Sequence, residues 1–132
     1  MKVRLNTEKI VLICPSAMAG LREVTAKRLR EAGFAVQMIP GTQCGGTVAD
    51  GLRGVYAESA EIAEPMMVFA GFGDGALNRA LATVRGVRGW LKAVATDTNR
   101  AWTWTALAQE LCAERAAFYK AEKEKTDGVE KE

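Results

Sequence analysis

The stretch Thr96-Asp97-Thr98-Asn99-Arg100 gathers the side chains of this chain that are best suited to binding an anion. Threonine hydroxyls and an asparagine amide donate hydrogen bonds, and a guanidinium adds a positive charge in a geometry that matches carboxylate and phosphate. Trp102 follows two residues later. The same residue types also close turns and cap helices. The stretch is therefore either part of a ligand site or the turn that leads into the next helix.

Two other turns carry similar chemistry. Ser16 follows the apolar run Ile10–Cys14, and Gly73-Asp74 follows the apolar run Met66–Ala70. If these runs are parallel strands, their carboxyl ends meet at one edge of a sheet, where α/β proteins bind ligands. We therefore predict a shared pocket in which helix N-terminal N–H groups face an anion. Its candidate ligand-binding residues are Ser16, Gly73, Asp74, Thr96, Asn99, Arg100 and Trp102.

The sequence offers no nucleophile with a base beside it. The chain has no histidine, which excludes His-based triads and His metal sites. The three cysteines are an odd number without a Cys-x-x-Cys spacing, which favours free thiols over a disulfide framework or a zinc site. They are Cys14, Cys44 and Cys112, and we expect Cys44, in a Gly-rich loop, to be the most exposed.

Three acidic residues at helical spacing could bind a hard cation, although a solvated helix face is the favoured interpretation. They are Glu58, Glu61 and Glu64. We therefore predict no catalytic residues, no metal and no cofactor, and we favour a protein that is not an enzyme.

Charge and hydropathy limit the partners. The 132 residues include 18 basic and 16 acidic side chains, a net charge of +2, so nucleic acid is not an expected partner. A basic cluster is interpreted as solvated surface and consists of Arg79, Arg85, Arg88, Lys92 and Arg100. No apolar run approaches the ~20 residues of a membrane span, and Ile10–Cys14 is too short for the core of an export signal. We expect a cytoplasmic protein that does not associate with membranes.

Apolar runs and helical stripes alternate along the chain. The runs at residues 9–14 and 66–70 are continuously apolar, which is typical of strands buried on both faces. Further strands are expected at residues 34–40 and 90–96. Helices are expected at residues 16–33, 47–53 and 74–86, with Ser16 and Asp74 as N-caps.

The last helix is expected to begin after Thr103, its N-cap, and its apolar stripe runs from Trp104 to Tyr119. We predict a single domain at residues 1–120, followed by a charged tail at residues 121–132 that we expect to be disordered.

This order of elements predicts an α/β fold. The first choice is a small three-layer domain with a mainly parallel four-stranded sheet in the order 2-1-3-4, covered by helices on both faces. The alternative is a ferredoxin-like α+β domain with an added C-terminal helix. That alternative requires an antiparallel pairing of the strands that contain Val36 and Met67.

The segment LKAVATDTNRAWTWTALAQELCAER, residues 91–115, resembles a small bacterial family catalogued as domain of unknown function 3783. Residues 66–81 are similar to the strand and helix that precede this segment in the family. Asp97 stands where the family turn often has Pro, and Ala106 where it often has an acidic residue. The matching positions are Lys92-Ala93-Val94, Thr96, Thr98, Asn99, Trp102, Thr103, Leu107 and Glu110-Leu111. The resemblance implies a family but no activity.

Three functions follow from these observations. The favoured one is a non-catalytic α/β module that binds a protein partner or forms a homodimer. The alternative is a regulatory domain that binds an anion or a nucleotide with the loops after the third and fourth strands. The third is weak nucleic-acid binding through the basic cluster, and enzyme activity has less support than any of the three because no nucleophile–base pair is present.

Overall fold

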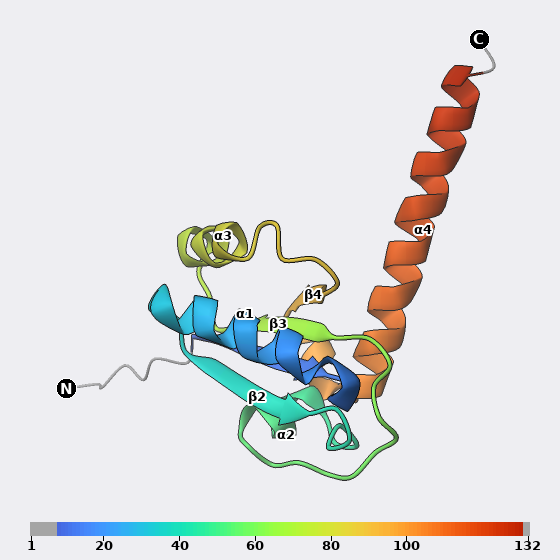
Figure 1. Ribbon diagram of the computed structural model, residues 1–132. Helices are drawn as coiled ribbons and strands as arrows, with labels where there is room; N and C mark the ends of the chain where they lie inside the picture. The colour runs from blue at the N-terminus through green and yellow to red at the C-terminus, as the bar shows by residue number, and fades with distance from the viewer. Residues whose placement is uncertain (1–7, 131–132) are drawn as a thin grey trace.

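A four-stranded sheet lies between two helical layers in the computed structural model, which describes the backbone of residues 8–130 and the side chains of residues 8–121 (Figure 1). The strands are β1 (Lys9–Cys14), β2 (Val36–Pro40), β3 (Met66–Ala70) and β4 (Leu91–Val94). Their order is β2-β1-β3-β4. The α/β class, the three layers and the strand order are thus confirmed.

The strand directions differ from the prediction. β1 pairs in parallel with β2, and β3 pairs in parallel with β4, but β1 and β3 are antiparallel. Ile13 lies opposite Met66, and Lys9 lies opposite Ala70. The sheet is therefore mixed, and the prediction of a mainly parallel sheet is wrong. The ferredoxin-like alternative is wrong as well, because β2 and β3 are not neighbours.

The connection between β2 and β3 explains this reversal. It contains the short helix α2 (Val48–Leu52), which carries the chain to the far end of β1, where the Lys9 ammonium donates a hydrogen bond to the Leu52 carbonyl. Residues 53–65, which we call the returning segment, then lead the chain back along the sheet. Ser59 N–H donates to the Thr42 carbonyl at 2.8 Å, and Ile62 N–H donates to the Gly41 carbonyl at 3.2 Å. β3 consequently starts at the edge where β1 and β2 end, and it has to run in the opposite direction.

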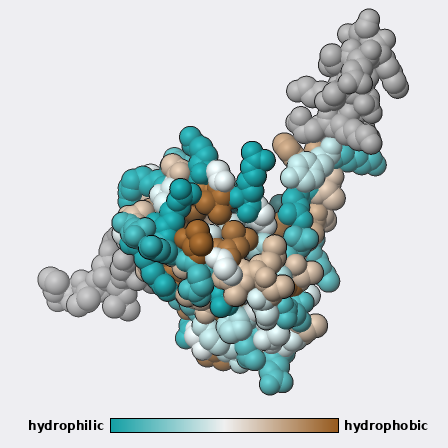
Figure 2. All heavy atoms as spheres, in the orientation of Figure 1, coloured by the Kyte–Doolittle hydropathy of each residue, from teal (hydrophilic) through white to brown (hydrophobic). Residues whose placement is uncertain are grey.

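One face of the sheet is covered by α1 (Ala19–Glu31) and α3 (Asp74–Thr83), and a short 3-10 turn, η1 (Ser16–Met18), leads into α1. The buried side chains of this layer are Ile10, Leu12, Cys14, Ala26, Leu29, Met67, Phe69, Ala80, Val84 and Trp90. Trp90 Nε1 donates to the buried Thr25 hydroxyl at 3.1 Å, which ties the start of β4 to α1. Figure 2 shows apolar side chains at the surface between α1 and α3, ringed by hydrophilic ones.

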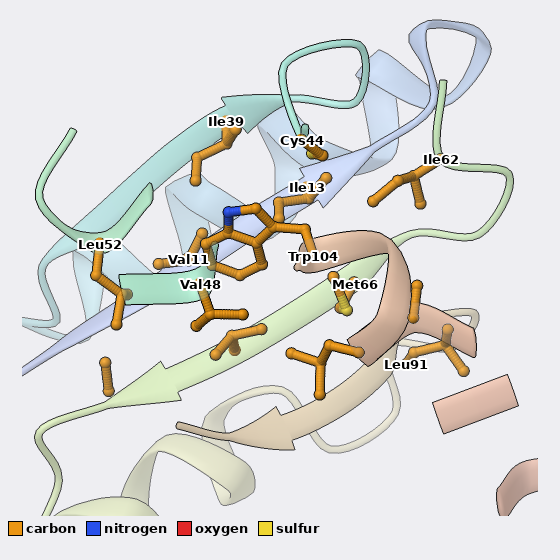
Figure 3. Close-up of a cluster of buried hydrophobic side chains, with 14 residues drawn as sticks. Val11, Ile13, Ile39, Cys44, Val48, Leu52, Ile62, Met66, Leu91 and Trp104 are labelled. Atoms are coloured by element: carbon orange, nitrogen blue, oxygen red, sulfur yellow. The ribbon is translucent and has the colours of Figure 1, made fainter. Parts of the chain in front are cut away.

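The other face is covered by α2, by the returning segment and by the start of α4 (Trp104–Glu130). Trp104 is 1% exposed, and its indole lies among Val11, Val48 and neighbouring side chains (Figure 3). Thr103 caps α4, as predicted: its hydroxyl accepts a hydrogen bond from Ala106 N–H at 3.0 Å. Because β1 and β3 are covered on both faces, their sequences carry no polar alternation.

α4 is too long for the sheet beneath it. Its 27 residues span about 40 Å at 1.5 Å per residue, whereas the six residues of β1 span about 20 Å. The helix therefore extends beyond the domain (Figure 1). Phe118 and Tyr119 are 60% and 63% exposed, so the expectation that the buried stripe continues to Tyr119 is wrong.

The helical backbone continues through the charged sequence to Glu130. From the sequence we expected the ordered chain to end near Lys120. The division into a domain at residues 1–120 and a tail at residues 121–132 stays a prediction.

Candidate functional site

The turn after β4 is closed by a reciprocal pair of hydrogen bonds. Thr96 N–H donates to Asn99 Oδ1 at 2.8 Å, and Asn99 N–H donates to Thr96 Oγ1 at 3.1 Å. Asn99 Nδ2 also donates to the Val94 carbonyl at 3.0 Å, and η2 (Asn99–Ala101) follows. This is the reciprocity of a capping box, used here to end a strand. The two side chains most suited to a ligand are thus engaged within the fold.

Trp102 and Arg100 take different places after this turn. Trp102 is half-buried against the core on the α4 face, and its carbonyl accepts a hydrogen bond from Val48 N–H at 2.8 Å. Arg100 is half-buried. Burial, and then the positive charge of Arg100, lower the pKa of the Lys9 ammonium. Two cationic side chains therefore lie close together at the edge where β3 and β4 end.

Ser16 lies at the opposite edge of the sheet, because β1 and β3 are antiparallel. Its N–H donates to Glu61 Oε1 at 2.6 Å, and its hydroxyl donates to Glu61 Oε2 at 3.4 Å. The Glu61 carboxylate thus holds the position at this helix start that an anion would take. Ser16 was expected to cap the helix, but it is the first residue of η1, and Pro15 is the capping position.

Gly73 and Asp74 share the edge that holds Thr96, since β3 and β4 are parallel. Gly73 is the capping residue of α3, without a side-chain bond, and Asp74 lies in the first turn. The prediction of Asp74 as the N-cap is therefore wrong, although a carboxylate in the first turn still stabilises a helix. The turns after β3 and β4 therefore lie at one end of the sheet, and the turn after β1 lies at the other. The prediction that all three turns form one pocket is wrong. Whether these residues bind a ligand stays a prediction.

The thiols are free, as expected, but their exposure is not as expected. Cys44 is 0% exposed, and burial raises its pKa to about 11. Cys14 is 1% exposed, its thiol donates to the Met18 carbonyl at 3.5 Å, and burial raises its pKa. Cys112 is half-buried and is the most accessible of the three. Cys44 packs in the core because the returning segment covers its loop: Gly45 N–H donates to the Ala57 carbonyl at 2.8 Å.

Among the residues that the structure describes, no group of three or more His, Cys, Asp or Glu side chains is arranged to hold a metal ion. No described helix combines the length and the apolar character that crossing a bilayer requires.

Sequence comparison addresses the part of the chain that contains β3, α3, β4 and the reciprocal turn. Residues 65–118 match the family model described as Domain of unknown function (DUF3783). The DUF3783 match ends at Phe118, within α4, and leaves out β1, α1 and β2. It includes Thr96 and Asn99, whose side chains shape the turn. No curated protein and no solved structure matches the chain.

The sequence did not predict an apolar cavity of about 350 Å³ between α4 and the returning segment. Ile62 and Ala63 line it from the segment, and Ala108 and Cys112 line it from α4. Glu64, on the same side, forms an ion pair with Arg115 at 3.4 Å. The cavity was missed because residues 57–64 had no assigned structure and Cys112 was placed within the core. The available signal was Ile62, a large apolar residue in an otherwise small and acidic stretch.

Proposed function

We propose that the chain is a non-catalytic α/β module that forms a homodimer through α4. The observation that carries this proposal is the high exposure of Phe118 and Tyr119, at 60% and 63%, on a helix that extends past its own domain. A helical segment without tertiary contacts is only marginally stable in water. A second helix packed along it supplies the missing apolar contacts.

The spacing of residues along α4 supports a second copy as the partner. Tyr119 follows Cys112 by seven residues, so it lies on the helix face that borders the apolar cavity. In an antiparallel pair with Cys112 opposite Ala116 of the second copy, Tyr119 lies opposite Gln109. The tyrosine ring then enters the cavity of the second copy. Small side chains at positions 112 and 116 allow the helices to approach closely.

Symmetry supports the same arrangement. Each copy offers the exposed Tyr119 and the apolar cavity beside Cys112, so the two contacts are identical and the assembly closes at two copies. The charges of the two surfaces are complementary as well, because Lys120 follows Tyr119 and Glu64 borders the cavity that receives the tyrosine. A surface pair of this kind contributes only about 0–1 kcal/mol, so it orients the helices more than it stabilises them.

The test is the mass of the protein in solution by light scattering. The wild-type chain should have twice the monomer mass of 14.2 kDa, and the double variant Phe118→Ser/Tyr119→Ser should have 14.2 kDa. Val24→Ser is the matched control, because Val24 is a 67% exposed apolar residue on α1, and it should remain dimeric. A monomeric wild-type chain, or a double variant that stays dimeric, contradicts the proposal.

We also propose that the protein works in a reducing cytoplasm. Three free cysteines, two of them buried, support this location, because oxidising compartments favour disulfides. Trapping thiols with an alkylating agent during cell lysis should find all three cysteines reduced.

The alternative function is anion binding by the loops after β3 and β4. It is supported by Arg100 and Lys9, two neighbouring cations, and by the Gly73 start of α3, which has no side-chain cap. The engagement of Thr96 and Asn99 with each other weighs against it. Inorganic phosphate or nucleotide should then raise the melting temperature of the wild-type chain, and Arg100→Ala should abolish that shift.

A further inference from the structure

β4 is an edge strand, paired with β3 on one side only. Leu91 N–H donates to the Pro65 carbonyl at 2.9 Å, and Ala95 N–H donates to the Phe69 carbonyl at 2.8 Å. Backbone groups alternate in direction along a strand, so those of Lys92 and Val94 point away from β3. The Val94 carbonyl accepts from Asn99 Nδ2. Within the described part of the chain, Lys92 N–H, Lys92 C=O and Val94 N–H have no hydrogen-bond partner.

A groove runs along this edge, between β4 and α4. It consists of two adjoining cavities of about 320 and 260 Å³, which share Lys92, Leu111 and Glu114. The floor is apolar, formed by Trp102, Leu107 and Leu111. The wall formed by α4 carries two carboxylates, Glu110 and Glu114, and one cation, Arg115. The charge of Arg115 is already paired with Glu64 at 3.4 Å.

We propose that this groove binds an extended basic peptide, which adds to the sheet as a fifth strand beside β4. The unpaired groups of Lys92 and Val94 supply main-chain hydrogen bonds, which is how exposed sheet edges capture peptides. Carboxylates on the helix select basic side chains. Alternate peptide side chains face α4, while the others cover Val94, which is 42% exposed. The preferred sequence therefore alternates basic and apolar residues.

This site is separate from the proposed dimer contact. Leu107, Leu111 and Glu114 line the groove, whereas Cys112 and Tyr119 lie on another face of α4. Peptide binding is therefore expected to persist in Phe118→Ser/Tyr119→Ser. Failure of one proposal leaves the other standing.

The test uses the full chain and a labelled, acetylated peptide amide with three Lys-Val repeats. Its fluorescence anisotropy should saturate, and amide resonances of residues 91–95 and 107–114 should shift in two-dimensional NMR spectra. Two peptides serve as controls. A Glu-Val repeat peptide should not bind, because it meets Glu110 and Glu114. A peptide N-methylated at alternate residues keeps the charge but cannot form the strand ladder, so it should bind at least about tenfold more weakly.

Two variants test the same contacts from the protein side. Lys92→Pro removes the outward N–H at an edge position, where proline is tolerated, and should weaken binding at least about tenfold. Lys92→Ala keeps that N–H and should still bind. Glu110→Gln/Glu114→Gln should weaken binding several-fold and reduce its dependence on salt.

Any of three results would overturn the proposal. The first is that the anisotropy of the Lys-Val peptide does not saturate, and the second is that the N-methylated peptide binds equally well. The third is that the resonance shifts lie on the apolar surface between α1 and α3. If Lys92→Pro fails to fold, the N-methylated peptide on the wild-type chain decides the question by itself.

Discussion

Gly51 of α2 lies directly against the indole ring of Trp104. A β-carbon at position 51 would come within 2.5 Å of both Cζ2 and Nε1 of that ring. A glycine inside a helix costs about 1 kcal/mol relative to alanine. Here the missing side chain allows α2 to close over the largest fully buried side chain of the core.

Gly51→Ala should therefore destabilise the fold, although alanine is the better helix former. Overpacking of a core typically costs about 1–3 kcal/mol, which exceeds the gain in helix propensity. Urea unfolding followed by tryptophan fluorescence measures the change. Gly20→Ala in α1 is the matched control, because a β-carbon there meets nothing within 4 Å, and it should leave stability unchanged or raise it. Equal effects of the two substitutions would contradict this account.

The reciprocal turn predicts a graded loss of stability at Asn99. Asn99→Asp keeps the acceptor for Thr96 N–H but loses the donor to the Val94 carbonyl, whereas Asn99→Ala loses both. Each lost bond is worth about 0.5–1.5 kcal/mol, so alanine should cost more than aspartate in thermal unfolding. If alanine leaves the unfolding transition unchanged, the turn does not depend on these bonds.

The sequence predicts the strands and the start of α4 because their signals are local. Continuous apolar runs identified β1 and β3, and Thr103 before a helical stripe identified the start of α4. The direction of β3 has no such signal, because an apolar run reads the same in both orientations. It depends on where residues 53–65 lead the chain, and the backbone bonds of Ser59 and Ile62 decide that.

The candidate site was harder to predict for a related reason. Thr96 and Asn99 have the composition of a ligand site, but their partners are each other. Serine is a common N-cap residue, but at Ser16 the backbone N–H donates instead to the carboxylate of Glu61, 45 residues away. Likewise, the stripe of α4 continues past the sheet, and the periodicity of a helix does not reveal where the neighbouring strands end.

Alkylation of cysteines in the native state should report on both the core and the dimer. Cys14 and Cys44 are buried, and their raised pKa values keep them as unreactive thiols near neutral pH. Cys112 should therefore react first with iodoacetamide. In the proposed dimer it faces the second copy, so it should react faster in Phe118→Ser/Tyr119→Ser than in the wild-type chain. Peptide mass spectrometry identifies the modified cysteine, and early labelling of Cys44 would refute the buried assignment.

The raised pKa of the Cys44 thiol also predicts that the folded chain loses stability at high pH. Its pKa is about 11 in the folded chain, compared with about 8.5 in an unfolded one. The folded state keeps the proton that the unfolded state releases, so this contribution is complete below about pH 8.5 and is lost as pH rises towards 11. The size is about 3 kcal/mol, because one pKa unit corresponds to about 1.4 kcal/mol. Cys44→Ala should be less stable at neutral pH but should lack this part of the pH dependence, measured by urea unfolding at each pH.

The pairing of α4 is tested most directly by the distance between spin labels at Ala121→Cys in two copies, in a Cys112→Ser background. Antiparallel helices that cross near Glu114 place the two backbones at position 121 roughly 20–25 Å apart, given a 1.5 Å rise per residue and helix axes 8–10 Å apart. Pulsed electron resonance should then give one distance of about this length, extended by the label tethers. The absence of any dipolar coupling would contradict the dimer, and a distance near 10 Å would indicate parallel helices and contradict the antiparallel pairing.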